Sequence, residues 1–320
     1  MIPIRDTIRS ETYPIVNSFI IAVNVLVFLV ELSQGQKLNE FIFVYGLVPA
    51  RYSIPQISAY FTTGQQAICF LSFMFLHGGF FHLLGNMWFL YMFGNNVEDR
   101  LGHFRYLIFY LLCGLGSGIS HLVLNWHSKI PTIGASGAIA GVMGAYFILY
   151  PRAKVLTLLP IFFFVELPAF LFLGIWLIFQ FLSATGSPGE TGGIAWWAHI
   201  GGFMFGIIFL KLFQMLPGSG VGGKIRGMTR KRTTPRLQVI RPAGFGPDPN
   251  FYAPIAITER EALFGVRKLI NIPQGFKKRP FFLTIPPDVS EGTTLRLKGL
   301  GRQTAEGLRG DLYLKVQIRG

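Results

Sequence analysis

Long stretches of this chain carry no charged side chain. They predict membrane-spanning helices, because a charged group at bilayer depth costs roughly 3 kcal/mol. Asp, Glu, Lys and Arg are absent from six windows: 12–30, 52–97, 106–128, 130–151, 167–189 and 191–210. Five windows are near the roughly 20 residues that one helix needs to cross the hydrocarbon. The long window 52–97 begins with proline, glycine and polar residues over Ser53–Ala67, so we interpret it as an interfacial approach to one span. The pattern therefore predicts six crossings.

Composition and charge divide the chain into two parts. The 320 residues are 51% hydrophobic and only 14% charged, with a mean hydropathy of +0.47, whereas a soluble domain carries about a quarter charged residues. Of the 29 Lys and Arg residues, 19 follow residue 215. We predict an all-α polytopic membrane bundle of six transmembrane helices over residues 1–215. A basic Gly/Pro-rich flexible linker (216–250) and a small, mainly β soluble domain (251–320) would follow.

The distribution of basic residues orients the predicted spans by the positive-inside rule. A cytoplasmic N-terminus leaves only three basic residues of the membrane body outside: Lys37, Arg51 and Lys129. It places the others, together with the basic tail from Lys211 onward, inside: Arg5, Arg9, Arg100, Arg105, Arg152 and Lys154. We therefore predict a multi-pass protein of a bacterial inner membrane with both termini in the cytoplasm.

Three polar features interrupt the apolar runs, each at the start of an even-numbered span. They are GASG at Gly134–Gly137, His77 with His82 and Asn86 in HGGFFHLLGN, and His199 in AWWAHIGG. Even-numbered spans run from outside to inside in this topology, so all three features should lie at one depth near the outer face. Ionisable residues inside a membrane are expensive and usually mark function.

Glycine spacing predicts which of these spans touch. Gly134, Gly137, Gly141 and Gly144 recur every three or four residues and so share one side of a helix. Gly202 and Gly206 form a GxxxG on span six, and small residues let helix backbones approach closely in lipid. Packing span four on span six would bring Ser136 near His199.

Such a pair has the chemistry of a nucleophile and its base. A serine hydroxyl is weakly nucleophilic until a neighbouring base takes its proton, and the tetrahedral oxyanion then needs preorganised donors. We expect Ser136 and His199 to form a catalytic dyad, with the Ser136 amide, Asn86 and His82 as oxyanion donors. No Asp or Glu is found at this depth to orient His199. A GxSG motif alone is more often a helix-packing motif, and a lone His in a membrane helix more often makes an interhelical hydrogen bond. The prediction therefore depends on the occurrence of these features together.

In combination, these motifs resemble the rhomboid family of intramembrane serine proteases over about residues 14–215. The similarity includes NNVEDRLG at 95–102. It implies a six-helix bundle that cleaves transmembrane segments of single-pass or other membrane proteins, with Ser136 as nucleophile and His199 as general base. It further implies an oxyanion hole of His82, Asn86 and the Ser136 amide, and structural roles for Glu98 and Arg100. His77, Gly134 and Gly137 would support the site, and no cofactor or metal is implied.

Two positions depart from the family pattern. Some members carry a Tyr four residues after the serine, where it stacks on the histidine, but this chain has Ala140. Some carry a Trp-Arg pair in the first outer loop, and none occurs between Glu31 and Ala67. Neither departure removes a reacting group, so the dyad prediction stands.

The segments outside the spans give weaker predictions. The loop Ser183–Gly193 is a candidate lid, although such loops are more often simple connectors. The linker contains a basic cluster of Lys224, Arg226, Arg230, Lys231, Arg232 and Arg236. Its position beside the membrane favours contact with anionic lipid, and we do not predict nucleic-acid binding.

The C-terminal residues change to a β pattern. A capping box at Thr258–Glu261 predicts a short helix, and alternation predicts strands over 281–285, 293–298 and 312–318. The string ITEREALFGVRKLINIP and the segments after it resemble the C-terminal peptide-binding domain of DnaJ-type co-chaperones, over about residues 250–320. That resemblance implies a cytoplasmic domain that binds an unfolded client or a protein partner. The sequence contains neither the HPD motif nor the CxxCxGxG motif of these co-chaperones, so recruitment of a chaperone ATPase by the usual route is not implied. A stabilising appendage is the alternative.

Other functions fit the sequence less well. A catalytically silent rhomboid-like scaffold or chaperone would not need both Ser136 and His199. A transporter would have repeated, broken helices, and we find no internal repeat. A metalloprotease of the common type would carry HExxH, which is absent from this sequence.

Overall fold

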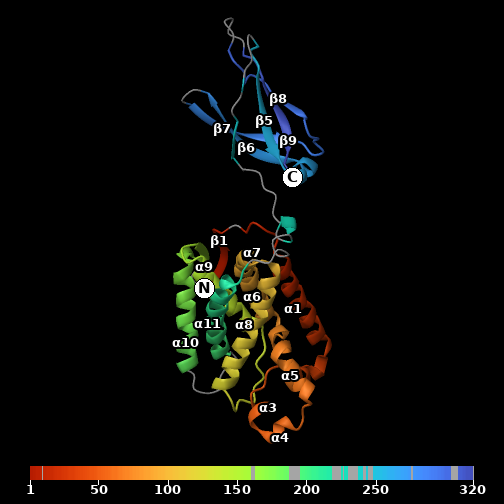
Figure 1. Ribbon diagram of the computed structural model, residues 1–320, viewed down its shortest axis with the longest axis vertical. Helices are drawn as coiled ribbons and strands as arrows, with labels where there is room; N and C mark the ends of the chain where they lie inside the picture. Colours follow the sequence, from red (N-terminus) through yellow and green to blue (C-terminus); the bar gives the residue numbers. More distant parts are fainter. Residues whose placement is uncertain are drawn as a thin grey trace. The chain divides into compact units, whose positions relative to one another are not determined.

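The computed structural model divides into two compact units, Met1–Arg230 and Lys231–Gly320. It describes residues 1–8, 10–159, 163–186, 195–217, 225, 227–229, 237–240, 243, 248–274, 277–303 and 309–319, with the backbone alone at 237, 272–274 and 277–281. The first unit is mainly helical and the second mainly β (Figure 1).

Among the residues described in the first unit, four helices are long and apolar enough to cross a membrane. They are α1 (Ile15–Ser33), α8 (His103–Leu124), α10 (Ala169–Gly186) and α11 (Trp196–Met215). A fifth span results if the segments Thr63–Phe75 and Phe80–Leu101, bent by 75° at the break between them, are counted as one. The helical membrane region therefore contains four to five candidate spans.

The helix expected as span four is shorter than predicted. It is α9 (Ser136–Leu149), with 14 residues, whereas a crossing takes about 20. The residues before α9 are held in an extended path, because Leu47 and Thr132 exchange backbone hydrogen bonds and Gly134 N–H donates to the Phe73 carbonyl. An apolar window of 22 residues thus yields one loop and a short, deeply buried helix.

The long window 52–97 is divided among several elements. It runs through α3 (Ala50–Ser53), α4 (Pro55–Ser58), α5 (Thr63–Ser72), the 3₁₀ turn η2 (Phe73–Phe75), α6 (Phe80–Phe89), a π-helical turn η3 (Leu90–Gly94) and α7 (Asn95–Leu101). Before them, the turn η1 (Gly35–Lys37) leads into α2 (Leu38–Tyr45). As the two glycines after His77 predict, α6 begins only at Phe80, which leaves His77 in the entry loop.

The prediction that the first unit is all-α is wrong. Three strands form an antiparallel sheet in the order β1–β2–β3: β1 (Ile2–Asp6), β2 (Lys154–Leu158) and β3 (Phe164–Pro168). Val155 of β2 is fully buried and pairs with Leu167. These segments are short and, apart from the last two residues of β3, lie outside the charge-free windows, so the charge pattern does not reveal them.

Glu98 fixes the start of α1. Its carboxylate accepts hydrogen bonds from the N–H groups of Val16 (3.0 Å) and Asn17 (2.7 Å), donors that the first turn of a helix leaves without an internal partner. His103 also contacts this carboxylate. Glu98 therefore has the structural role that the family resemblance implies, whereas Arg100 is exposed.

The second unit contains two three-stranded sheets. One has the order β4–β6–β7 and the other β5–β9–β8. The strands are β4 (Leu237–Val239), β5 (Phe251–Ile257), β6 (Val266–Gln274), β7 (Lys277–Ile285), β8 (Thr294–Leu297) and β9 (Leu312–Ile318). The capping box of Thr258 and Glu261 opens the short helix α13 (Glu259–Phe264), which confirms the predicted helix. The predicted strands correspond to β7, β8 and β9, whereas β4, β5 and β6 were not predicted.

Candidate active site

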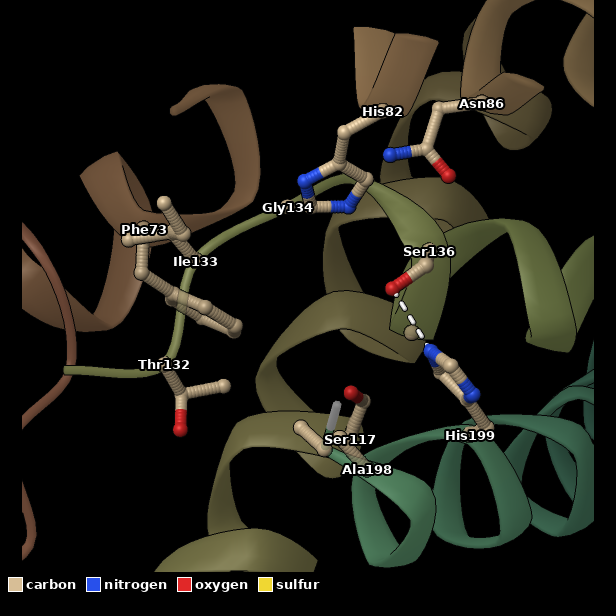
Figure 2. Close-up of a pocket in the computed structure, with 12 residues that line it drawn as sticks. Phe73, His82, Asn86, Ser117, Thr132, Ile133, Gly134, Ser136, Ala198 and His199 are labelled. Carbon is tan, nitrogen blue, oxygen red and sulfur yellow. Dashed lines mark hydrogen bonds between the residues drawn. The ribbon is translucent and has the colours of Figure 1, made fainter. Parts of the chain in front are cut away.

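Ser136 and His199 lie in direct contact. Ser136 is the first residue of α9 and His199 lies in the first turn of α11. The Nε2 atom of His199 is 2.8 Å from the Ser136 Oγ atom. A dashed line marks this contact in Figure 2. This is the distance of a hydrogen bond between a hydroxyl and an imidazole nitrogen.

Glycines bring these two helices together. A Cβ atom on Gly202 would lie 2.0 Å from the carbonyl oxygen of Gly137, and one on Gly144 would lie 2.3 Å from that of Phe203. Real side chains do not make such contacts, so the backbones of α9 and α11 touch only because these residues are glycine. The predicted packing of span four on span six is confirmed. Gly137 also faces α8, where a Cβ atom would lie 1.8 Å from the Ser117 Oγ atom.

The second nitrogen of His199 contacts a residue that the sequence analysis did not identify. The Nδ1 atom is 2.7 Å from Oε1 of Gln180 in α10. The amide nitrogen of Gln180 donates to the carbonyl oxygen of Trp176 at 3.4 Å, so its oxygen is the atom that faces the imidazole. The search for an Asp or Glu missed it because the partner is neutral. Gln180 is the only side-chain amide in the window 167–189, which could have drawn attention to it.

Two tryptophans flank the imidazole where some rhomboids use a tyrosine. The ring centroid of Trp176 is 6.0 Å from that of His199, and Trp196 approaches it edge-on at 6.2 Å. Ala140 is fully buried in α9 and contributes only a methyl group. The aromatic contacts of His199 therefore come from α10 and α11.

His82 and Asn86 present hydrogen-bond donors on the opposite side of Ser136 (Figure 2). The His82 Nδ1 atom accepts a hydrogen bond from the Gly78 N–H at 3.3 Å, which leaves the proton of the neutral ring on Nε2. The Nδ2 atom of Asn86 is buried, and no acceptor lies within hydrogen-bonding distance among the residues that the structure describes. The Ser136 N–H is the first of α9, where helices leave amide groups without an internal acceptor. These three groups match the donors expected of an oxyanion hole.

Gly134 permits this approach. Its φ angle is +123°, a conformation that L side chains rarely adopt. A Cβ atom at this position would lie 3.0 Å from the Nε2 atom of His82. Both the backbone conformation and the space beside the imidazole therefore require glycine here.

His77 does not line the cavity around Ser136 but lies behind His82. The two imidazole rings meet edge to face with centroids 5.2 Å apart. The backbone N–H of His77 donates to both carboxylate oxygens of Glu31, at 3.0 and 3.1 Å. Glu31 projects from α1 and is almost fully buried. It was not among the predicted site residues, since it lies just outside the first charge-free window.

A cavity of about 430 Å³ contains the polar groups. Its lining comes from the starts of α6, α9 and α11, from α8 and from the extended residues before α9: Phe73, His82, Asn86, Ser117, Thr132, Ile133, Gly134, Ser136, Gly137, Ala195, Ala198 and His199. The structure thus brings the three polar features of the sequence to one place. Residues 187–193 of the suggested lid lie outside the described residues. Within the described part of the chain, no three His, Cys, Asp or Glu side chains are grouped as metal ligands.

These features define a class of protein, namely a helical membrane protein with a serine and an imidazole in contact inside a polar cavity. Residues 64–215 match the family model of the Rhomboid domain. The matched residues include Ser136, His199, Gln180, His82 and Asn86.

Several curated relatives carry the same name. The chain is 28% identical over 200 residues to Rhomboid protein 1, mitochondrial, of Saccharomyces cerevisiae, covering 59% of this chain and 51% of the relative. It is 30% identical over 165 residues to RHOMBOID-like protein 6, mitochondrial, of Arabidopsis thaliana, covering 49% and 47%. It is 28% identical over 197 residues to Presenilin-associated rhomboid-like protein, mitochondrial, of Mus musculus, covering 56% and 49%. The chain thus spans about half the length of these relatives.

The comparisons do not support the resemblance of residues 250–320 to DnaJ-type co-chaperones. The family match ends at residue 215. What the structure establishes for the C-terminal region is the presence of two small β-sheets.

Proposed function

We propose that this protein is an intramembrane serine endopeptidase that cleaves transmembrane segments of single-pass or other membrane proteins. The observation that carries the proposal is the 2.8 Å contact between the Ser136 Oγ atom and the His199 Nε2 atom. The rhomboid domain and the unpaired donor of Asn86 support it.

The mechanism follows from the positions of these atoms. His199 Nε2 takes the hydroxyl proton of Ser136 while Oγ attacks the scissile carbonyl carbon. The oxyanion then accepts hydrogen bonds from Asn86, His82 and the Ser136 N–H. Each such donor typically contributes about 3 to 4 kcal/mol to the transition state. The protonated His199 next gives its proton to the departing amine, which breaks the peptide bond. Water attacks the remaining ester with His199 again as base, which releases the acid and restores Ser136.

The membrane arrangement is part of the proposal. We propose six crossings, with α9 as a short span and the pair α5–α6 as a broken one, and both termini in the cytoplasm. Residues 1–215 would form the protease body, 216–250 the linker and 251–320 a separate domain. The three relatives named above are mitochondrial by name, so the comparisons do not support the bacterial inner membrane inferred from the sequence. The orientation can be tested with variants that carry a single cysteine at position 37 or at position 152, labelled from either side of sealed vesicles. The proposed orientation predicts that the two cysteines are labelled from opposite sides.

Reconstitution with a single-pass substrate tests the activity. Wild type is expected to cleave it, whereas Ser136→Ala and His199→Ala abolish cleavage. Ser120→Ala on α8 and His127→Ala in an exposed loop are matched controls that retain activity. Cleavage that survives loss of Ser136 or His199 would overturn the dyad, and inactivity of wild type would favour the silent scaffold.

For the C-terminal unit, we propose binding of an extended apolar segment of a client or partner. The supporting observation is Phe282 on the edge strand β7, which is 61% exposed beside Arg267. An edge strand can pair with an added peptide strand. Phe282→Ser in the full chain should weaken binding of an extended apolar peptide without changing cleavage of a short substrate. Unchanged peptide binding would favour the stabilising appendage.

A further inference from the structure

We propose that Gln180 is the positioning residue of the His199 base and takes the place that a carboxylate occupies in a full triad. The inference rests on the proposed protease function and deepens it. It adds α10, which contributes no residue to the cavity lining, to the helices α6, α8, α9 and α11 that form the active site.

The hydrogen bonds of Gln180 fix its orientation and, with it, the tautomer of His199. The amide nitrogen donates to the Trp176 carbonyl, one turn earlier in α10, so a flipped amide would place two oxygens against each other. The amide oxygen is therefore the atom 2.7 Å from Nδ1 of His199. An oxygen without a proton can only accept, so Nδ1 carries the proton of the neutral ring. Nε2 then has a free lone pair facing the Ser136 hydroxyl, which is the arrangement that a general base requires.

The burial of Gln180 explains why a neutral group suits this position. Its side chain is only 4% exposed, and it lies in a helix that is a candidate membrane span. An ionised carboxylate here would lack a counter-charge and would be costly to bury in a membrane. An amide orients the imidazole at a smaller cost, but it stabilises the protonated ring less than a carboxylate does. The protein thus gains orientation without placing a charge inside the bilayer.

Trp176 contributes to the same arrangement. It supplies both the acceptor for the Gln180 amide and one of the two rings beside His199. Trp176 and Gln180 are four residues apart and so share one face of α10. This face holds His199 in place without Asp, Glu or the tyrosine found in some rhomboids.

Three substitutions at position 180 separate positioning from simple structural support. Gln180→Leu keeps the size and removes the acceptor, Gln180→Asn shortens the side chain, and Gln180→Glu retains an acceptor. Thr185→Val, at an exposed position of the same helix, is the matched control. We expect Gln180→Leu to lower kcat about 10- to 100-fold with KM within about twofold, because loss of the correct tautomer affects the chemical step. Gln180→Asn should be similarly impaired and Thr185→Val unchanged.

The variant Gln180→Glu is the decisive one. Because burial favours the neutral acid, cleavage is compared at alkaline pH, where the ionised carboxylate of Gln180→Glu accepts the Nδ1–H bond and should restore kcat to within about fivefold of wild type. This variant should also move the acid limb of the pH–rate profile to higher pH, since an ionised carboxylate favours the protonated imidazole. Among the described residues, His82 from α6 and His121 from α8 interact electrostatically with His199, and both are unchanged in these variants. Equal loss in Gln180→Leu and Gln180→Glu, or full activity of Gln180→Leu, would overturn the inference.

A spectroscopic measurement keeps the inference separate from the proposed activity. In ¹⁵N NMR of the full chain in micelles, His199 should give one neutral tautomer with its proton on Nδ1, and Gln180→Leu should give a mixture. This result does not depend on turnover. Inactive wild type with the Nδ1–H tautomer would reject the protease and keep the positioning role, whereas a tautomer unaffected by Gln180→Leu would reject that role.

Discussion

Gly206 of α11 lies so close to α9 that a Cβ atom on it would fall 2.0 Å from the carbonyl oxygen of Gly141. The obstacle would be backbone, which cannot rotate away as a side chain can. The contact lies on the same pair of helices as the dyad, about two turns after His199 along α11 and about one and a half turns after Ser136 along α9. The register of α9 against α11 is therefore set by glycine, and the meeting of the dyad depends on that register.

We expect Gly206→Ala to separate the two helices. The overpacking should cost at least about 1 to 3 kcal/mol of stability, lower the thermal midpoint in micelles and slow cleavage. Gly174→Ala on α10 is the matched control, since a Cβ atom there meets nothing within 4 Å. Equal thermal midpoints and cleavage rates for Gly206→Ala and Gly174→Ala would contradict the role of this contact.

We expect Asn86→Ala to remove an oxyanion donor without disturbing the fold. The rate constant kcat should fall about 100- to 1,000-fold while KM changes little, because the donor acts on charge that develops only in the transition state. Steady-state cleavage in liposomes measures both constants. Leu84→Ala, at a half-exposed position of the same helix, should leave kcat near the wild-type value. An effect of Asn86→Ala confined to KM would assign Asn86 to substrate binding instead.

We expect Glu31 to maintain the loop that supports His82. Glu31→Leu leaves the buried N–H of His77 without its acceptor, which should cost about 1 to 3 kcal/mol. Glu31→Gln keeps an oxygen acceptor and should cost less. Thermal unfolding and hydrogen exchange of peptides spanning residues 73–86 measure the effect. Slower or unchanged exchange in Glu31→Leu would show that this carboxylate does not hold the loop.

We expect a pH-dependent contact in the C-terminal unit. The Gly299 N–H, 2.8 Å away, and then the Arg296 guanidinium hold the pKa of Asp311 below its ordinary value of 3.8. A lowered pKa means that the stabilisation is complete above about pH 4 and is lost as the pH falls through the lowered value. The NMR shift of the Gly299 amide should therefore titrate with a midpoint below about 4, and Asp311→Asn should abolish this titration. A midpoint at or above the ordinary value would contradict the contact.

The sequence predicted those parts of the structure that local periodicity specifies. Small residues every three or four positions identified the α9–α11 interface, and the capping box of Thr258 and Glu261 identified α13. Alternation identified β9 over its full length. Each of these patterns is complete within one short segment, so it can be detected without knowledge of the fold.

The parts that could not be predicted depend on contacts between distant segments. Gln180 is a neutral residue in an apolar helix, and only the packing of α10 on α11 places it against His199. The sheet of β1, β2 and β3 joins segments about 150 residues apart, none of which alternates over a long run. The length of α9 is set by the pairing of Thr132 with Leu47, which hydropathy does not reveal.

The proposed activity requires that His199 activates the Ser136 hydroxyl inside the membrane domain. Covalent labelling of the full chain with a fluorophosphonate, followed by mass spectrometry of the modified peptide, tests it without any choice of substrate. We expect one adduct on Ser136 in wild type, in Ser120→Ala and in His127→Ala. We expect no adduct in Ser136→Ala, and labelling at least about 100-fold slower than wild type in His199→Ala, because an unactivated serine reacts poorly. Labelling of Ser136 at the wild-type rate in His199→Ala, or a wild-type protein that stays unlabelled, would contradict it.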